Sequence, residues 1–426
     1  MREAPLQGVY ELGEPGEDVE LFLGEGALNG EPVGPVRIWM SMSNRLRVRW
    51  QAENPLRSVD LERSQLSIDH PQLGPVEIPL DVHHSDGWGT CPGTELGTGT
   101  RMARVVAHWP NLPMLLPGSP LESGKQSWAG RWTVESCGWR FTLDCRQDYS
   151  EVRRSANESD KQFALTHVGE LRRADSGEFD AESARDVLFG WQLAFSFALG
   201  RWVAPALPVG LDREEQRVWE QWAPWRCDTL RGYESWWDTH TADDLAQFFA
   251  VYLQAYLDHH QRPIVRHVAM HMITGNHSGT TAEGKVMLAQ AGLEYLAWVT
   301  LVLTGVMSRR TYREMTAAER LRLLLNESAI PLNVPRGLEA LSDLADQRGL
   351  DGPDVTAWVR NRLVHPKDAD EPYRIEGLVW QAAQLLLEYG ELLLLHRLGY
   401  TGRFMRRYPP HRWAHSSEPV PWATTR

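Results

Sequence analysis

Residues 360–366, with the sequence Arg-Asn-Arg-Leu-Val-His-Pro, carry the side chains best suited to chemistry in this chain of 426 residues. The Arg360 guanidinium can hold a phosphate through a planar fork of donors, and it stays charged at neutral pH. The His365 imidazole can take up and release protons near neutral pH. Cleavage of RNA by its own 2′-hydroxyl needs these two functions, a proton shuttle and a cation on the phosphorane. The pair is therefore a candidate site for phosphate chemistry.

A helix must position this pair. Residues 351–354 (Asp-Gly-Pro-Asp) are typical of a helix start, because proline fits the first helical position and acidic side chains suit the positive helix end. We expect a helix over about 353–364, which Pro366 ends because the residue before a proline disfavours helical geometry. On an unbroken helix, Arg360 and His365 would lie about 140° apart. If the helix ends before or at His365, the imidazole can swing back towards the guanidinium.

The Arg-x4-His spacing alone is a weak signal. It recurs at residues 262–267 and 406–411, as expected of so short a pattern. The copy at 360–365 differs by its context, because it has a polar neighbour in Asn361, a helix before it and a long apolar helix after it.

Several segments before this motif form a series with it. The series contains residues 320–325 (RLRLLL), 330–335 (IPLNVP), 338–344, 351–353 (DGP) and 360–366. Together they resemble the HEPN superfamily of helical ribonucleases. They look most like the branch found in bacterial anti-phage proteins of the ApeA type. The similarity covers about residues 180–400, is strongest over 316–366, and is loose over the first 150 residues.

The resemblance implies a metal-independent endoribonuclease that uses no cofactor. His365 would act as general base or acid, Arg360 would neutralise the phosphorane, and Asn361 would hold the pair or the phosphate. The motif would meet its copy across a homodimer formed by the helical domain, and the RNA products would carry a 2′,3′-cyclic phosphate and a 5′-hydroxyl. The implied role is abortive defence against phage or a toxin-like activity. The β-rich domain would then sense a phage-derived trigger or a protein partner.

A noncatalytic alternative stays open, because HEPN-like bundles also bind nucleotides or proteins without cutting RNA. The intact triplet of Arg360, Asn361 and His365 favours the enzyme, since a binding module does not need it. An Arg360 held in an internal ion pair, with His365 facing no cleft, would favour the binding module.

Glu294 lies in an apolar segment, residues 292–298 (GLEYLAW), where an unpaired carboxylate is costly to bury. We expect it to orient Arg360 or His365. The alternative is a structural ion pair with some other arginine.

The C-terminal tail mixes cations and flat rings. Residues 397–413 contain no acidic residue, and their arginines alternate with aromatic side chains, a composition that suits single-stranded RNA. The residues expected to bind RNA are Arg403, Arg406, Arg407 and Tyr408. The alternative is a solvated tail that folds back on the acidic body by charge.

Composition excludes several classes of protein. A net charge of -12 argues against a nonspecific nucleic-acid coat protein, although a small basic site on an acidic body remains compatible with it. The four cysteines lack zinc-like spacing, and the acidic first 20 residues do not form a signal peptide, so we expect a reducing cytoplasm. The longest apolar run, residues 295–307, is too short for a bilayer, so no membrane role is expected.

Two further motifs are near misses. Residues 279–285 resemble a phosphate loop but lack the Ser or Thr that holds magnesium, and a helix cap explains them better. His267 and His271 share a helical face but have no evident third ligand, so no metal site is expected.

The fold expected is α+β and multidomain. Apolar and polar residues alternate over 36–42 and 45–50, which predicts strands in a β-rich domain over 1–180, a sandwich or a barrel. Helical periods dominate 181–400, where Thr316 and Glu319 form a capping box for a helix to about Leu325. We assign residues 181–400 to an all-α HEPN-like bundle and 401–426 to the basic, aromatic tail. The last helix, about 372–396, is apolar all round and must be buried on several sides.

Overall fold

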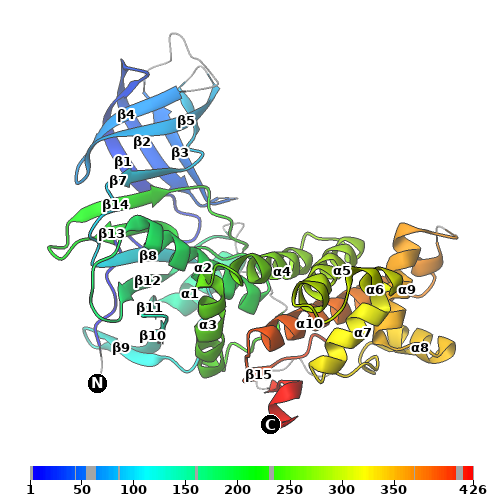
Figure 1. The fold of residues 1–426 in the computed structure, drawn as a ribbon. Coiled ribbons are helices and arrows are strands. Elements are labelled where there is room, and N and C mark those ends of the chain that lie inside the picture. Colours follow the sequence, from blue (N-terminus) through cyan, green and yellow to red (C-terminus); the bar gives the residue numbers. More distant parts are fainter. Residues whose placement is uncertain are drawn as a thin grey trace. The chain divides into compact units, whose positions relative to one another are not determined.

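The computed structural model describes residues 3–43, 45–53, 64–84, 87–158, 162–229, 235–368, 370–408 and 416–425. The chain divides into two units. Unit 1 contains Met1–Gln192 and Val203–Gly232, and unit 2 contains Leu193–Trp202 and Tyr233–Arg426. Strands dominate the first unit and helices the second, which confirms the predicted α+β class (Figure 1).

The first strands of unit 1 close into a barrel, with neighbours in the order β1-β2-β3-β6-β5-β4. Their bounds are β1 Val19–Leu28, β2 Glu31–Ser41, β3 Arg47–Ala52, β4 Ser64–His70, β5 Gly74–His84 and β6 Trp88–Thr90. Side chains alternate between the inside and the outside because successive residues of a strand point to opposite faces. Thus Val36, Ile38 and Met40 are buried, whereas Arg37 between them is exposed. Of the two β architectures expected, this part of the chain is a barrel.

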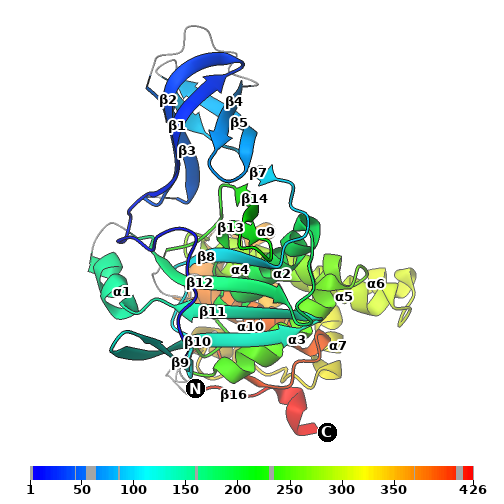
Figure 2. The ribbon, with the colours of Figure 1, turned by 90° about the vertical axis from the view of Figure 1, so that its left-hand side faces the viewer.

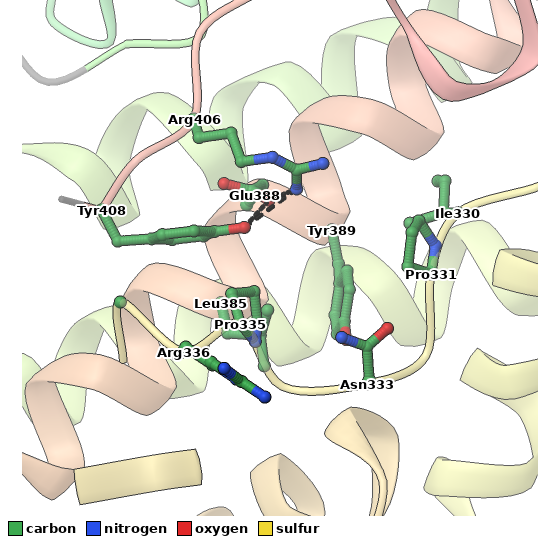
Figure 3. A pocket seen from close by; sticks show the side chains of 11 residues that line it. Ile330, Pro331, Asn333, Pro335, Arg336, Leu385, Glu388, Tyr389, Arg406 and Tyr408 are labelled. Atoms are coloured by element: carbon green, nitrogen blue, oxygen red, sulfur yellow. Dashed lines mark hydrogen bonds and ion pairs between the residues drawn. The ribbon is translucent and has the colours of Figure 1, made fainter. Parts of the chain in front are cut away.

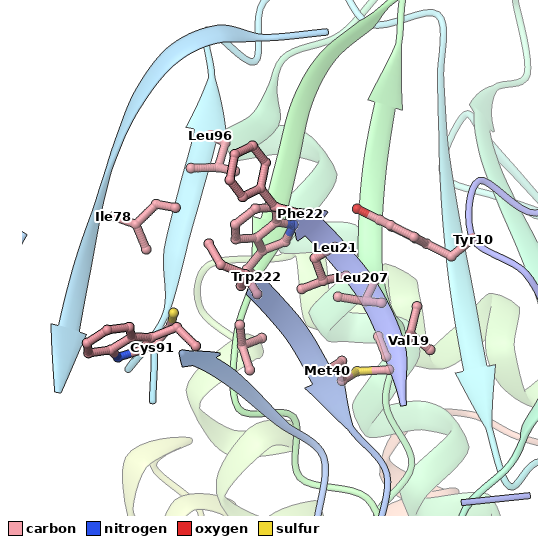
Figure 4. Packing of buried hydrophobic residues seen from close by; sticks show 14 of the residues in the cluster. Tyr10, Val19, Leu21, Phe22, Met40, Ile78, Cys91, Leu96, Leu207 and Trp222 are labelled. Carbon is pink, nitrogen blue, oxygen red and sulfur yellow. The ribbon is translucent and has the colours of Figure 1, made fainter. Parts of the chain in front are cut away.

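The remaining strands of unit 1 form an antiparallel sheet in the order β7-β14-β13-β8-β12-β11-β10-β9 (Figure 2). Their bounds are β7 Thr94–Gly97, β8 Arg104–Pro110, β9 Ser119–Ser123, β10 Gln126–Ser136, β11 Trp139–Cys145, β12 Leu165–Arg173, β13 Ala206–Leu211 and β14 Arg217–Trp222. Along the chain, helix α1 (Tyr149–Glu158) connects β11 to β12, and helix α2 (Ala181–Leu199) connects β12 to β13. Barrel and sheet residues share one hydrophobic cluster, in which Figure 4 shows Val19, Met40, Leu207 and Trp222.

Strands β13 and β14 lie inside the range, 181–400, in which the sequence predicted helices alone. All six residues of β13 are buried between β8 and β14. Such a strand is a continuous apolar run without the alternation that marks a half-buried strand. The β-rich unit therefore extends beyond the boundary expected near residue 180.

Unit 2 is built from helices. Their bounds are α3 Ala242–Leu257, α4 Arg262–Asn276, α5 Ala282–Trp298, α6 Arg309–Glu314, α7 Ala317–Glu327, α8 Glu339–Arg348, α9 Gly352–Val364 and α10 Leu378–Arg397. A π-helical turn, η1 (Val299–Leu303), continues α5, and short 3-10 helices lie at η2 (Glu371–Tyr373) and η3 (Pro421–Thr425). The two-residue strands β15 (Arg403–Phe404) and β16 (Glu418–Pro419) pair near the C-terminus. The capping box of Thr316 and Glu319 opens α7 as predicted.

Helix α10 is the core of unit 2. All its residues from Ala382 to Leu395 are buried, and it packs against α5, α4, α9 and α8. Among the described residues, two segments are long and apolar enough to cross a membrane, Ala282–Leu303 and Leu378–Arg397. In the second segment, 89% of the apolar window is buried within the protein, so its apolar composition is that of a core helix. In the first segment, 50% of the window is buried.

Candidate functional site

Helix α9 presents the Arg-x4-His motif, and local chemistry sets where this helix begins. Asp351 is the N-cap, and its carboxylate accepts a hydrogen bond from the backbone N–H of Asp354 at 2.9 Å. Arg322 of α7 donates to the carboxylates of both aspartates, at 2.7 Å each. The observed span, Gly352–Val364, confirms the predicted helix.

The other end of α9 releases His365 from helical geometry. This residue is the C-cap, with φ -128° and ψ 67°, and its backbone N–H donates to the Asn361 carbonyl at 2.8 Å. Pro366 follows, as expected of a residue that prevents another helical turn. Asn361 and His365 are exposed, and Arg360 is half-buried. The helix thus ends where the sequence predicted it would.

Arg360 has an unusual set of neighbours. Its guanidinium donates one hydrogen bond, from Nη1 to the Asn361 side-chain oxygen at 3.2 Å. Its Nε is buried without a hydrogen-bond partner, and no carboxylate lies within 4 Å of the guanidinium in the described part of the chain. By contrast, Arg362 pairs with Glu371 at 3.1 Å and lies over the Trp358 ring. Arg362 therefore fastens η2 to α9, whereas Arg360 keeps its charge available to an anion.

Glu294 does not take either of its expected roles. Its carboxylate accepts a hydrogen bond from the Gln290 side chain, one turn earlier in α5, at 3.0 Å. The Tyr312 hydroxyl donates to its backbone oxygen at 3.3 Å. Among the described residues, neither the motif nor any arginine lies within ion-pair distance of this carboxylate. Because the side chain is only half-buried, its position in the apolar segment does not require an ion pair.

The tail residues expected to bind RNA are mostly engaged inside unit 2. Arg407 is fully buried and donates to Glu391 at 2.6 Å, to Gln384 at 3.0 Å and to Asn276. Arg406 pairs with Glu388 at 3.0 Å and with Glu418 at 2.7 Å. The hydroxyl of the buried Tyr408 also donates to Glu388, at 3.1 Å (Figure 3).

The prediction of an RNA-binding tail is therefore wrong for Arg407 and Tyr408. The physical reason is that α10 carries two buried glutamates, and a buried carboxylate requires a cation or donors. Burial raises the pKa of Glu388, and the Arg406 guanidinium opposes that rise. The alternative was a solvated tail that folds back on the acidic body by charge. The tail does fold back by charge, but Arg406 and Arg407 pair with glutamates of the core helix α10. Arg403 remains exposed, and its guanidinium donates a hydrogen bond to the Ser417 hydroxyl. His411, which ends the Arg-x4-His copy at 406–411, lies outside the described residues.

Two cavities of unit 2 lie away from the motif. One, of about 290 Å³, is lined by residues that include Asn333, Arg336, Tyr389 and Arg406 (Figure 3). The other, of about 260 Å³, is lined by residues of η1, α7 and α10 that include Thr300, Ser328 and His396. Neither is lined by Arg360, Asn361 or His365.

Exposed apolar side chains adjoin the motif in the chain, a feature that the sequence did not reveal. The exposed fractions are 40% for Val364, 55% for Tyr373, 36% for Ile375 and 41% for Trp380. We call these four residues the apolar cluster because they lie close together in the sequence. Val364 and Trp380 belong to helices whose apolar runs indicate core, and only the packing shows that these two side chains face solvent.

The fold and site define a two-unit α+β protein whose helical unit displays an Arg-Asn-His triplet at a helix end. The YopA central domain matches residues 97–233, and the YopA C-terminal domain matches residues 258–418, the range of this chain in which the triplet lies. The "SPbeta prophage-derived uncharacterized protein YopA" of Bacillus subtilis (strain 168) is 30% identical over 315 residues, which cover 72% of this chain and 69% of that protein. The chain belongs to the YopA family. No solved structure matches it.

Proposed function

We propose that the chain is a metal-independent endoribonuclease of HEPN type, with Arg360, Asn361 and His365 as its catalytic residues. The observation that carries the proposal is the state of Arg360, whose guanidinium bonds Asn361 and meets no carboxylate within 4 Å among the described residues. A guanidinium left without its own anion is suited to bind a phosphate.

The chemistry follows from what each side chain can do. His365 would accept the proton of the ribose 2′-hydroxyl or protonate the leaving 5′-oxygen. Arg360 would stabilise the negative charge that grows on the phosphorane. Asn361, which already accepts from Arg360, would hold the guanidinium in position. The products would be a 2′,3′-cyclic phosphate and a 5′-hydroxyl, and no metal or other cofactor is needed for this reaction.

A second copy of the chain would complete the site. Asn361 and His365 are exposed in one copy of the chain, whereas catalysis favours a site that excludes water. The apolar cluster supplies four exposed apolar side chains close in sequence to the triplet, and exposed apolar surface marks protein interfaces. A two-fold dimer of unit 2 would place two Arg360 and two His365 side chains around one phosphate.

The biological setting we propose is abortive defence against phage, or a toxin-like activity, in the cytoplasm. Its support is the resemblance to anti-phage HEPN proteins. Unit 1 would then carry the sensor for a phage-derived trigger or a protein partner, since an unrestrained ribonuclease would harm its host.

The test is RNA cleavage by the full chain in the presence of EDTA, with growth arrest on expression as a second readout. Replacing a general acid or base, or a group that stabilises the transition-state charge, typically costs about 100-fold or more in rate. We expect that loss for His365→Ala and for Arg360→Ala, with product ends as stated above in the wild type. His260→Ala, which removes an exposed histidine between α3 and α4, is the control and should cut at the wild-type rate.

Equal cleavage by all four proteins would overturn the assignment of the site. A noncatalytic binding module is the second candidate, and the exposure of His365, which lines neither of the two cavities described, is the observation that favours it. In that case the wild type would leave RNA intact under every condition, yet His365→Ala and Arg360→Ala would still weaken binding of a nucleotide or a protein.

A further inference from the structure

One outer face of the barrel carries arginines in a row. Along β3 the side chains alternate, so that Arg47, Arg49 and Gln51 point outwards while Val48 and Trp50 are buried inside. Arg45, two residues before Arg47, is exposed as well. Outward side chains two residues apart on a strand are separated by about 6.6 Å. Arg47 and Arg49 therefore form a line of positive charge along β3, and the exposed Arg45 lies in the bend before the strand.

Among the described residues, no ion pair neutralises this line. In the described part of the chain, no carboxylate lies within 4 Å of the guanidinium of Arg45, Arg47 or Arg49. The cross-strand neighbours of Arg49 are Trp39 on β2 and Thr90 on β6. A face that serves only for solubility usually sets opposite charges across neighbouring strands. Here the neighbours are an aromatic ring and a hydroxyl.

Aromatic rings flank the line on both sides. Trp39 lies on β2 beside Arg49, and Trp88 lies on β6 beside Gln51. Trp88 is 43% exposed, and its ring is 5.5 Å from that of His83. Because adjacent strands are about 4.8 Å apart, each indole is one strand away from β3. The outward residues of β2, β3 and β6 thus form a basic aromatic face.

Acidic groups border this face without crossing it. On β1, Glu20 pairs with Arg37 at 3.3 Å, and Arg37 in turn lies over the Trp39 ring. On β5, the exposed Asp81 is the cross-strand partner of Thr90. The unpaired cations are thereby confined to β3 and to the turn before it. The rest of the chain is acidic, with a net charge of -12, and repels a large anionic surface. A basic strip of this width therefore favours an anionic partner that is itself narrow.

We propose that the basic aromatic face binds single-stranded nucleic acid. The arginines along β3 would follow successive phosphates of an extended strand, and the rings of Trp39 and Trp88 would stack on its bases. Cationic grooves with stacking rings bind single strands with little sequence preference. A regular duplex hides its bases, so it could use the arginines but not the rings. This proposal does not depend on the ribonuclease proposal, because the face lies in unit 1 and the triplet in unit 2.

The test is fluorescence anisotropy with the full chain carrying His365→Ala, which prevents cleavage of the probe. The probes are a labelled oligouridylate of about twelve nucleotides, the same length of oligothymidylate, and an RNA duplex. We expect the single strands to bind more tightly than the duplex. Trp88→Ala should weaken single-strand binding about 5- to 150-fold, and Trp88→Phe should weaken it less, because a ring remains for stacking.

The double variant Arg47→Gln, Arg49→Gln tests the phosphate contacts. It should weaken binding and lower the slope of log affinity against log salt concentration by about 1.4, the value for two lost contacts. Its matched control is Arg153→Gln, Arg154→Gln on α1, a pair of exposed arginines outside the barrel. This control should bind the oligonucleotides with the same affinity and salt dependence as the protein with an unchanged β3.

Three results would overturn the proposal: no binding of either oligonucleotide, equal losses in the β3 double variant and its α1 control, or equal affinity for duplex and single strands. Failure of the ribonuclease proposal would look different. In that event, RNA would stay uncut by the wild type while the β3 variants still lost binding.

Discussion

Three arginines of unit 2 carry the same charge but meet different surroundings. Arg407 is fully buried and bonds Glu391, so its charge is used to stabilise α10. Arg362 joins η2 to α9 through Glu371. Arg360 bonds the Asn361 amide and meets no carboxylate within 4 Å in the described residues. Of the three, Arg360 is the one whose charge can act on a ligand.

Buried histidines of unit 1 make its stability depend on pH. Burial lowers the pKa of His108 to about 4 and that of His167 to about 3, and both side chains are almost fully inaccessible. In the unfolded chain each would titrate near 6.5. Between pH 6.5 and these lower values the unfolded state binds more protons, so stability falls as the pH falls.

We therefore predict that acidification from pH 7 to pH 5 costs about 2 kcal/mol for each of these histidines. Urea unfolding of the full chain at the two pH values measures this loss. His167→Leu should shrink the difference between pH 7 and pH 5 by about 2 kcal/mol, whatever it does to stability at pH 7. An unchanged difference would show that His167 is not held neutral by burial.

At the scale of the element, α9 connects local sequence to the candidate site. Its N-cap Asp351 also receives Arg322 from α7, so one carboxylate both starts the helix and fixes it to its neighbour. Its C-terminal turn carries Arg360 and Asn361, and His365 follows as the C-cap. The position of the site therefore depends on a carboxylate at the opposite end of the helix.

Asp351→Ala should destabilise unit 2 by about 1–2 kcal/mol, because an N-cap and a partly buried ion pair are lost together. Urea unfolding gives the loss, and hydrogen exchange should show faster exchange along α9. The control is Asp343→Ala, an exposed aspartate inside α8, which should stay within about 0.5 kcal/mol of the wild type. Similar losses in both variants would remove the special role of Asp351.

At the scale of the whole molecule, unit 1 is organised around a barrel and a sheet, and unit 2 around α10. Most large apolar side chains among the described residues are buried, whereas the four residues of the apolar cluster, near the triplet in sequence, are exposed. Exposed apolar patches of this kind mark sites of association. The proposed dimer gives the cluster a partner, which is a second copy of itself.

We predict that the full chain is a dimer and that Trp380→Asp converts it to a monomer, because a charge placed in a self-complementary patch is met by its own copy. Light scattering coupled to size-exclusion chromatography measures the mass. Leu303→Asp changes another exposed apolar residue of unit 2, with 61% exposure, and should leave the dimer intact. A wild-type monomer, or dimer loss by Leu303→Asp alone, would contradict this interface.

Much of the fold could be predicted because its signals are short in range. Alternation over residues 36–42 and 45–50 predicted strands β2 and β3, and the capping box of Thr316 and Glu319 predicted the start of α7. The limits of α9 followed from an aspartate before its first turn and a proline after its last. The strand β13 was missed, because a strand buried on both faces lacks alternation, and its partner β14 was missed with it.

The sequence by itself determined the α+β class, the ends of α9 and the placement of the Arg-Asn-His triplet at a helix end, because neighbours within a few residues decide each of these. The tertiary structure alone decided which charges are free. Arg407 meets Asn276 from 131 positions away, and the outward row on β3 gains Trp39 and Trp88 only through strand pairing. Such partners are set by packing between segments that are distant in the chain, and no local pattern records them.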